Sequence, residues 1–384
     1  MLLPDDKLES MRGRPLKQPE FLTAINPNDR IPSGHPIRRI KKFCDEALRR
    51  LSPLFDELYA EEGRPSIPPE QLLKARVLMA LHSVRSERFF CQQLQWNILW
   101  SWFLDREMDQ GSWNHSVFSK NSERVLAREC AQLFFRAIYD QSREEGWASD
   151  EHFSADGTLI EAWASMKSFV RKDGGDEKKV RDSKDDDPGN PTISFKGEKR
   201  RNDTHQSTTD PDSVLYRKAA GQESKLCYGF HLLMENRHGL VAEMDVFNPV
   251  EQTEAQVALE QIKTRAADSG IKPRSVGADK NYHHRPFIGE CRRLGVKPHT
   301  AQIEGRRVEG LDARSTRRKG YRLSQRIRKQ IEERFGWMKV CGGLRKTRYK
   351  GRDRVGAWGY FIGAACNLVR MAGLALGPPL LPSQ

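Results

Sequence analysis

Residues 225–247, KLCYGFHLLMENRHGLVAEMDVF, consist of two apolar runs on either side of Asn236-Arg237-His238-Gly239. Two apolar runs joined by a short polar turn are typical of a β-hairpin. Gly239 can adopt the positive φ that such a turn requires. We therefore predict two antiparallel strands here. The segments before and after them must then add to the same sheet or cover it.

The segments around the hairpin predict alternating strands and helices. A short alternating run, HFSADGTLIEAW, precedes it and suits a strand that ends near Asp156. After it we expect a helix from about Glu251 to Ser269, the strand RSVGAD ending at Asp279, the short helix HHRPFIGECRRLG, the strand VKPHTAQ, a long amphipathic helix and the final apolar helix AWGYFIGAACNLVRMAGLAL. Asn367 and Arg370 interrupt this last run, which favours a buried packing helix over a membrane span. This order is that of a mixed α/β sheet of the ribonuclease H type.

The rest of the chain predicts a second, helical domain. Residues 1–148 contain amphipathic segments separated by short polar turns, which fit a helix-turn-helix arrangement or a plain helical bundle. Residues 149–376 would form the α/β domain and 377–384 a tail. Within the α/β domain, 165–224 is rich in charge, Gly, Ser, Asp and Pro, so we expect a charged insertion or arm between the first two strands.

The positive charge of the chain is concentrated in one segment. Residues 297–354 carry 19 basic and six acidic side chains, and this local excess equals the net charge of +13 of the whole protein. Such a block favours a polyanionic partner, nucleic acid before an acidic membrane. Our preferred site for the DNA backbone is the stretch 306–322, and a solubilising loop is the alternative. Its candidate DNA-binding residues are Arg317, Arg318, Lys319, Tyr321 and Arg322.

Three separated acids stand out as candidate metal ligands. Asp156 and Asp279 follow predicted strands, each beside a small residue that leaves room for a metal ion or phosphate, and Glu332 lies on the later helix. Carboxylates that converge at one sheet edge can bind two Mg²⁺ ions for phosphoryl transfer. Singly, each acid has a simpler interpretation, because an Asp after a strand usually caps a turn and a helical Glu is usually solvated.

The helix that carries Glu332 adds cations on the same face. Arg328 lies four residues before the acid and Lys339 seven after it, which places all three side chains on roughly one face. Both cations could hold DNA phosphates beside a metal-bound carboxylate. Ile331, Phe335 and Met338 form the neighbouring apolar stripe and are expected in the core.

The joint motif set resembles the DDE insertion-sequence transposases, in particular the branch called family five. The resemblance rests on DGT, ADKNY and RKQIEERFGWMK…GLRKTRYKG, and on LYRKAAGQESKLCYGFHLLMENRHGL, AACNLVRMAGLAL and GRPSIPPEQLLKARVLMALHSVRSERFFCQQL. It covers nearly the whole chain, from about Phe43 to Leu376.

The resemblance implies a ribonuclease H-like core with Asp156, Asp279 and Glu332 as catalytic, metal-binding acids. The implied cofactor is Mg²⁺, with Mn²⁺ able to substitute. Related transposases carry a Tyr-Arg-Glu-Lys signature around the third acid; here Gln325 stands at the Tyr position, and Tyr321, one turn earlier, could replace it. Further DNA contacts are expected from basic residues of the same motif, Arg345, Lys346 and Arg348.

The expected function is therefore that of a DNA transposase of a bacterial-type insertion sequence. It would bind terminal inverted repeats, hydrolyse a phosphodiester and transfer the 3′-hydroxyl end to target DNA, as a homodimer or larger assembly that holds two ends. The alternatives are a transposase-derived repressor without catalysis and a ribonuclease H-like nuclease without strand transfer. Seven scattered cysteines and the lack of an apolar signal core predict a cytoplasmic, nucleoid-associated protein with no membrane partner.

Overall fold

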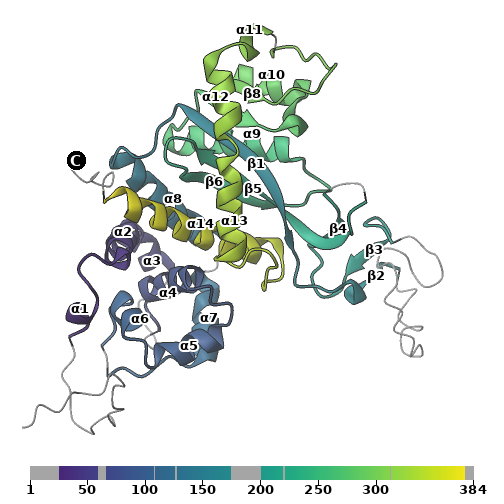
Figure 1. Cartoon of the computed structure of the whole chain (residues 1–384). Helices are drawn as coiled ribbons and strands as arrows, with labels where there is room; N and C mark the ends of the chain where they lie inside the picture. The colour runs from purple at the N-terminus through teal and green to yellow at the C-terminus, as the bar shows by residue number, and fades with distance from the viewer. Residues whose placement is uncertain are drawn as a thin grey trace, which may run out of the picture.

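In the computed structural model, the residues described are 26–58, 66–107, 109–125, 128–173, 200–218, 221–311 and 313–376 (Figure 1). The main sheet has six strands. They are β1 (His152–Glu161), β4 (Val214–Tyr216), β5 (Lys225–Glu235), β6 (Val241–Phe247), β7 (Ser275–Ala278) and β8 (Lys297–Thr300).

The strand order β6-β5-β1-β7-β8 decides the fold. β5 is antiparallel to both β6 and β1, whereas β7 is parallel to both β1 and β8. Three antiparallel strands followed by two parallel ones, in this spatial order, form a ribonuclease H-like sheet. The predicted fold class is therefore confirmed.

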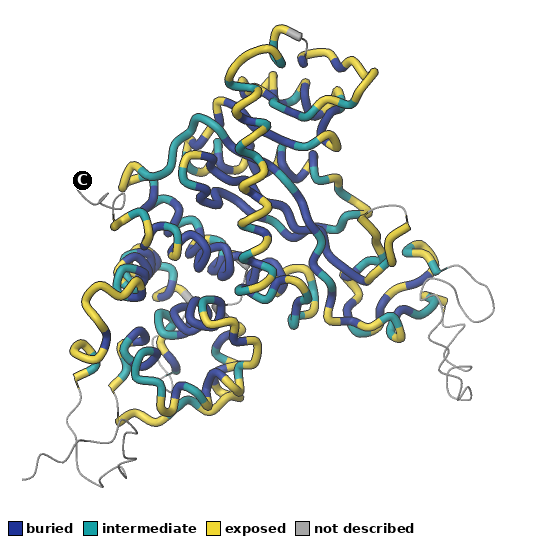
Figure 2. The backbone as a smooth tube through the Cα atoms, in the orientation of Figure 1, coloured by how far each residue is buried: buried dark blue, intermediate teal, exposed yellow. Residues whose placement is uncertain are grey.

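The predicted hairpin is present as β5 and β6, and Gly239 has φ +69° in its turn. Ten consecutive residues of β5, from Leu226 to Glu235, are buried. Such a continuous run is typical of a strand covered on both faces. Figure 2 shows the corresponding dark blue centre of the sheet.

Helices cover both faces of the sheet. One face is covered by α9 (Glu254–Ser269) with α10 (Arg285–Arg293), and the other by α12 (Lys319–Ile327), α13 (Gln330–Val340) and α14 (Arg352–Leu374). The long predicted helix is thus divided at Arg328 and Lys329. A short α11 (Ala313–Thr316) precedes it.

The N-terminal region is helical, as expected. Its helices are α1 (Pro27–Arg30), α2 (Pro36–Arg50), α3 (Ser52–Leu58), α4 (Pro69–Leu81), α5 (Glu87–Leu94), α6 (Ile98–Phe103), α7 (His115–Val125) and α8 (Arg128–Glu144). The C-terminal helix α14 packs against α8, α2 and α4 as well as β6. One hydrophobic core therefore runs from the helical region into the sheet.

Part of the charged segment 165–224 is ordered. β2 (Phe169–Arg171) and β3 (His205–Ser207) pair after the short 3-10 helix η1 (Met166–Ser168), and β4 joins the edge of the main sheet at β5. The carboxylate of Asp210 accepts hydrogen bonds from the Tyr228 hydroxyl at 2.6 Å and the Gly351 N–H at 3.0 Å. Asp210, a buried acid, thus links this segment to β5 and to the start of α14. Residues 174–199 lie outside the described part.

No helix in the described residues is long and apolar enough to cross a membrane.

Candidate active site

Asp156 and Asp279 lie where β7 separates from β1. The two strands pair only from His152 to Ser154, with Ser154 opposite Gly277. The last residues that β1 and β7 pair with each other are Ser154 and Gly277. Asp156 and Asp279 each lie two positions after them. Side chains alternate along a strand, so both carboxylates lie on the face that α12 and α13 cover.

The expectation that Asp156 ends its strand was wrong. β1 continues in antiparallel pairing with β5 as far as Glu161, so Asp156 lies in the middle of a ten-residue strand. What ends beside it is the neighbouring strand β7, and this separation opens the sheet next to the carboxylate.

The environment of the two aspartates favours a cation. Burial raises the pKa of the Asp156 carboxyl, the charge of Asp279 raises it further, and Lys218 and Arg328 act in the opposite direction. The Gly157 N–H donates to Asp156 at 2.8 Å. Asp279 caps the 3-10 helix η2 (Lys280–Tyr282) by accepting from the Asn281 N–H at 2.7 Å. Each carboxylate keeps oxygen lone pairs available, and a cation between them would relieve their repulsion.

Helices α12 and α13 cross the face that carries both aspartates (Figure 1). A β-carbon at Gly277 would lie 2.9 Å from the Ser324 hydroxyl and 3.5 Å from Cβ of Arg328, so the helix approaches β7 through the missing side chain. Farther along, Nζ of Lys339 donates to the Thr158 hydroxyl at 2.6 Å. Arg328 and Lys339 therefore lie over β7 and β1 respectively.

Glu332 lies between these two cations along the helix and is exposed. None of the described residues pairs with its carboxylate. Within the described ranges, no three His, Cys, Asp or Glu side chains converge closely enough to hold a metal ion. The structure thus brings Asp156 and Asp279 together, and Glu332 stays a predicted ligand on the crossing helix.

The residue at the signature Tyr position, Gln325, is used inside the protein. Its amide donates to the backbone carbonyls of His299 and Ala278, and its carbonyl accepts from Nε of Arg328 at 3.1 Å. Tyr321 donates its hydroxyl to the Thr300 carbonyl at 2.8 Å. Both side chains tie α12 to the ends of β7 and β8, and Gln325 also orients Arg328.

A buried hydrogen-bond chain supports the segment after Asp279. His231 of β5 contacts Gln261 of α9 at 2.7 Å through Nδ1 and the Tyr282 hydroxyl at 2.8 Å through Nε2. Because the Gln261 carbonyl only accepts, Nδ1 carries the proton and Nε2 accepts from Tyr282. Burial lowers the pKa of His231 to about 4, so the ring is neutral. The chain joins α9, β5 and η2.

Comparison with known protein families finds two matches. Residues 25–124 match the family described as "Transposase domain (DUF772)", and residues 198–368 match the one described as "Transposase DDE domain". The second match includes Asp279 and Glu332, and its strand β5 pairs with β1, the strand that carries Asp156. The chain belongs to the DDE transposases. It is therefore a DNA transposase, of an enzyme family that cleaves and joins DNA strands with divalent metal ions.

Other comparisons add little about this transposase. No curated protein sequence matches it at a significant level. Two solved structures overlap with it at 11% identity: a pre-cleavage Mos1 transpososome, with a TM-score of 0.20 over 89% of this chain and 98% of that one, and a Mos1 transposase paired-end complex with the left transposon end, with a TM-score of 0.19 over 84% and 100%. TM-scores this low do not indicate a shared fold.

The basic residues of the transposase fall into two groups. The exposed ones are Arg317, Arg318, Lys319, Arg322 and Arg345. Arg348 is instead held inside, between the rings of Tyr349 and Trp358 at 4.7 and 5.2 Å and 3.7 Å from Glu87. Lys346 pairs with Glu161 at 3.0 Å. The sequence does not distinguish the groups, because the acids beside the enclosed cations, Glu87 and Glu161, lie far away along the chain.

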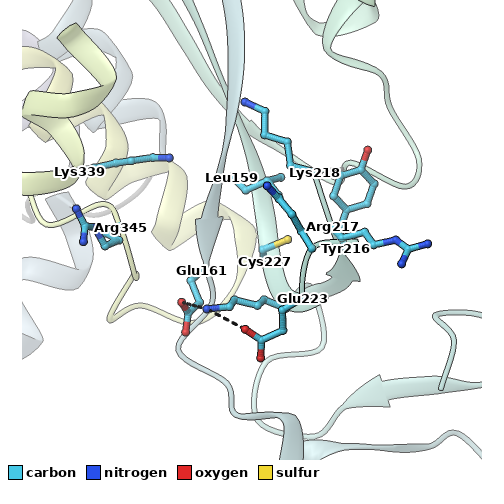
Figure 3. Close-up of a pocket in the computed structure, with 11 residues that line it drawn as sticks. Leu159, Glu161, Tyr216, Arg217, Lys218, Glu223, Cys227, Lys339 and Arg345 are labelled. Carbon is cyan, nitrogen blue, oxygen red and sulfur yellow. Dashed lines mark ion pairs between the residues drawn. The ribbon is translucent and has the colours of Figure 1, made fainter. Parts of the chain in front are cut away.

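A basic cavity of about 310 Å³ opens beside β1 (Figure 3). Lys339 and Arg345 lie on one side of it, and Tyr216, Arg217 and Lys218 on the other. Its cations are Arg217, Lys218, Lys225, Lys339 and Arg345, against the two acids Glu161 and Glu223. Lys225 already contacts both acids, at 3.7 and 3.5 Å. The other cations give the cavity a net positive charge.

Sequence reasoning missed two residues beside the aspartates, Lys218 and Glu254. Nζ of Lys218 reaches the Gly157 carbonyl at 3.4 Å, and Glu254 lies over Gly157 from the first turn of α9. Thr253 and Gln256 form a capping box that the sequence could have revealed. Nothing in the sequence shows which strand that helix start faces.

Proposed function

We propose that this transposase binds the terminal inverted repeats of an insertion sequence, hydrolyses a phosphodiester there, and transfers the freed 3′-hydroxyl end to target DNA. The observation that carries the proposal is the junction of β1 and β7, which has Asp156 and Asp279 on one face beneath α12 and α13, with Arg328 at the end of α12 and with Glu332 and Lys339 on α13. The finer assignment to the family-five branch rests on the sequence motifs alone.

The basic cavity supports a path for DNA toward the acids. A second cavity, of about 460 Å³, shares Leu159, Tyr216 and Lys218 with the first and extends to Glu254. Phosphates in the basic cavity would lie between Lys339 and Lys218, and both cations are close to β1. A strand bound there would bring one of its phosphodiesters to the carboxylates.

The proposed metal is Mg²⁺, with Mn²⁺ as a substitute, held by Asp156, Asp279 and Glu332. The oxygen donors fit a hard divalent cation. When bound, such ions activate the attacking oxygen and stabilise the leaving oxygen during in-line displacement. The protein's own part is to orient the DNA: Gln325 positions Arg328, Thr158 positions Lys339, and these two cations hold phosphates on either side of Glu332.

The remaining parts of the proposal concern assembly. The N-terminal helices would recognise the end sequences, and the exposed arginines and Lys319 around α12 would follow the backbone. Pairing of two transposon ends requires at least two copies of the chain, hence a homodimer or larger complex with double-stranded DNA. It would act in the cytoplasm on the nucleoid.

The test uses labelled DNA carrying the inverted repeats that flank the gene, in buffer with Mg²⁺. Asp279→Asn and Glu332→Gln should lose cleavage and joining while they retain DNA binding in a gel-shift assay. Glu333→Gln is the matched control, because this neighbouring exposed acid points about 100° away around the helix.

Two outcomes would favour the alternatives. DNA binding by the wild type with no Mg²⁺-dependent chemistry would indicate a repressor. Cleavage without joined products would indicate a nuclease. Equal activity of Glu332→Gln and Glu333→Gln would remove Glu332 from the metal site and leave the two aspartates.

A further inference from the structure

A groove runs between α5 and α7 on the outside of the N-terminal helices. The two helices pack against each other (Figure 1). Two cavities, of about 360 and 440 Å³, lie along them, and Arg88 of α5 and His115 of α7 line both. Polar side chains such as Gln92 of α5 and Ser119 of α7 line the rest. Because the cavities share two side chains, they form one continuous groove.

The groove has a net positive charge. Arg88 and Lys120, both exposed, line it, and Glu87 is the one acid among its described lining residues. The carboxylate of Glu87 already lies 2.8 Å from the guanidinium of Arg76 and 3.7 Å from that of Arg348. Neither Arg88 nor Lys120 forms an ion pair within the described residues. Both cations are therefore available for an anionic partner.

Exposed aromatic rings lie beside these cations. Phe89, next to Arg88 on α5, is 48% exposed. Trp96, just after the end of the same helix, lines the groove and is 65% exposed. Large apolar side chains that are exposed together commonly mark a binding surface. Aromatic rings beside unpaired cations suit a nucleic acid, because its sugars and bases pack against the rings while its phosphates bind the cations.

Arg85, three residues before Arg88, connects the groove to the basic cavity beside β1. Its guanidinium donates to the Lys346 carbonyl at 2.9 Å. The residue before Lys346 is Arg345, which lines the basic cavity. The groove is thus fastened to the loop that carries a cation of the cavity, and both positively charged surfaces belong to one ordered part of the protein.

We propose that the groove between α5 and α7 binds the phosphate backbone of double-stranded transposon-end DNA. Arg88 and Lys120 each contact a phosphate, and the rings of Phe89 and Trp96 pack against the sugars. The inference rests on the proposed function, because it gives the end DNA a defined place on the N-terminal helices. The other candidate occupant is a second copy of the chain. A symmetric contact through this groove would bring the unpaired cations of both copies together, which favours DNA.

The test measures binding of the full chain to a labelled duplex with the inverted repeat, by fluorescence anisotropy without Mg²⁺ so that the DNA is not cut. In Arg88→Gln and in Lys120→Gln we expect the slope of log affinity against log salt concentration to decrease in magnitude by about 1, and in the double variant by about 2. Lys42→Gln is the matched control, because Lys42 is an exposed lysine of α2 that lines neither cavity. Its slope should equal that of the wild type.

A second variant distinguishes DNA from a second copy of the chain. Trp96→Ala should weaken binding to the duplex roughly five- to tenfold with an unchanged salt slope, because the ring packs against DNA but carries no charge. In sedimentation velocity without DNA, the variant and the wild type should have the same mass. A smaller assembly in Trp96→Ala would show that the groove is an interface between copies and would overturn the proposal.

The outcomes separate this inference from the proposed function. Wild-type slopes in Arg88→Gln and Lys120→Gln, together with a reduced slope in Lys339→Gln, would overturn the groove and leave the proposed function intact. Equal affinity of the wild type for the inverted-repeat duplex and a scrambled duplex would overturn both the recognition of ends and this assignment. Reduced slopes in both variants with a normal control support the inference.

Discussion

The ammonium group of Lys339 lies 2.6 Å from the hydroxyl of Thr158, two residues beyond Asp156 on β1. This hydrogen bond fixes α13 against the strand that carries the first aspartate. Burial lowers the pKa of Lys339, and the neighbouring charges of Lys218 and Arg345 lower it further. The positive charges of Lys339, Lys218 and Arg345 thus repel one another beside the acids. A bound phosphate would reduce this repulsion.

Lys339 should therefore contribute to the salt dependence of DNA binding. In Lys339→Gln we expect the slope of log affinity against log salt concentration to decrease in magnitude by about 1, because one phosphate contact is lost. Lys346→Gln is the control, since Glu161 already neutralises Lys346 at 3.0 Å. Its slope should stay close to that of the wild type in fluorescence anisotropy titrations. The same slope for Lys339→Gln and the wild type would contradict the phosphate contact.

Gly157→Ala should disturb the contact between β1 and α9 without unfolding the protein. The added methyl group overlaps the end of the Glu254 side chain, which is flexible enough to move away. We expect a lower Tm for Gly157→Ala, and little additional decrease when the change is made in Glu254→Ala, because the shorter side chain no longer overlaps the methyl group. Gly289→Ala, where nothing lies within 4 Å of the new β-carbon, is the control. Additive losses in the double variant would show that Gly157 acts independently of Glu254.

Glu87 should stabilise the contact between the N-terminal helices and the loop before α14. It pairs with the fully buried Arg76 at 2.8 Å and with Arg348 at 3.7 Å. Glu87→Gln leaves a buried guanidinium unpaired and should lower the free energy of unfolding by about 3 to 5 kcal/mol in urea titrations. Glu123→Gln, which breaks an exposed pair with Arg354, should cost less than about 1 kcal/mol. Equal effects of the two substitutions would contradict a buried network.

His231 should make stability depend on pH below neutrality. Its pKa is lowered from 6.5 to about 4 by burial, and its ring faces the uncharged Gln261 and Tyr282. As the pH falls from 6.5 to 4, the unfolded chain gains a proton that the folded ring does not take up, so stability is lost. The expected loss between pH 7 and 4.5 is roughly 2 to 3 kcal/mol.

The measurement for His231 compares urea unfolding of the wild type and His231→Gln at both pH values. His299, whose pKa burial also lowers to about 4, titrates in the same window and remains in both proteins. The variant should therefore be less stable at pH 7 but lose less stability on acidification. A pH dependence identical to that of the wild type would show that His231 is not the group responsible.

Much of the catalytic fold could be predicted from local signals. The hairpin follows from its polar turn and Gly239, and the strands and helices after it follow from their apolar periodicity. The position of Asp156 within β1 could not be predicted, because the strand's continuation depends on pairing with β5, about 70 residues away. The strands of the segment 165–224 were missed for a similar reason: β2 pairs with β3 and β4 pairs with β5, and neither pairing leaves a local pattern in the sequence.

Likewise, some residues of the candidate site could be predicted from the sequence and others could not. Asp156, Asp279 and Glu332 could be selected by their motifs, and Arg328 and Lys339 by helical spacing. Sequence spacing alone does not reveal that Glu254 lies over Gly157, or that Arg348 lies beside Glu87 of a distant helix. These contacts join elements that approach each other only after the sheet has formed.

Motifs and apolar periodicity are local properties of the chain, so the family, the order of the elements and the types of side chain near the site could all be predicted from the sequence. The separation of β7 from β1 beside Asp156, the position of Glu254 over Gly157 and the exposure of each cation follow from contacts between distant segments. The physical reason is that burial and the charge around each group depend on the neighbours that folding supplies.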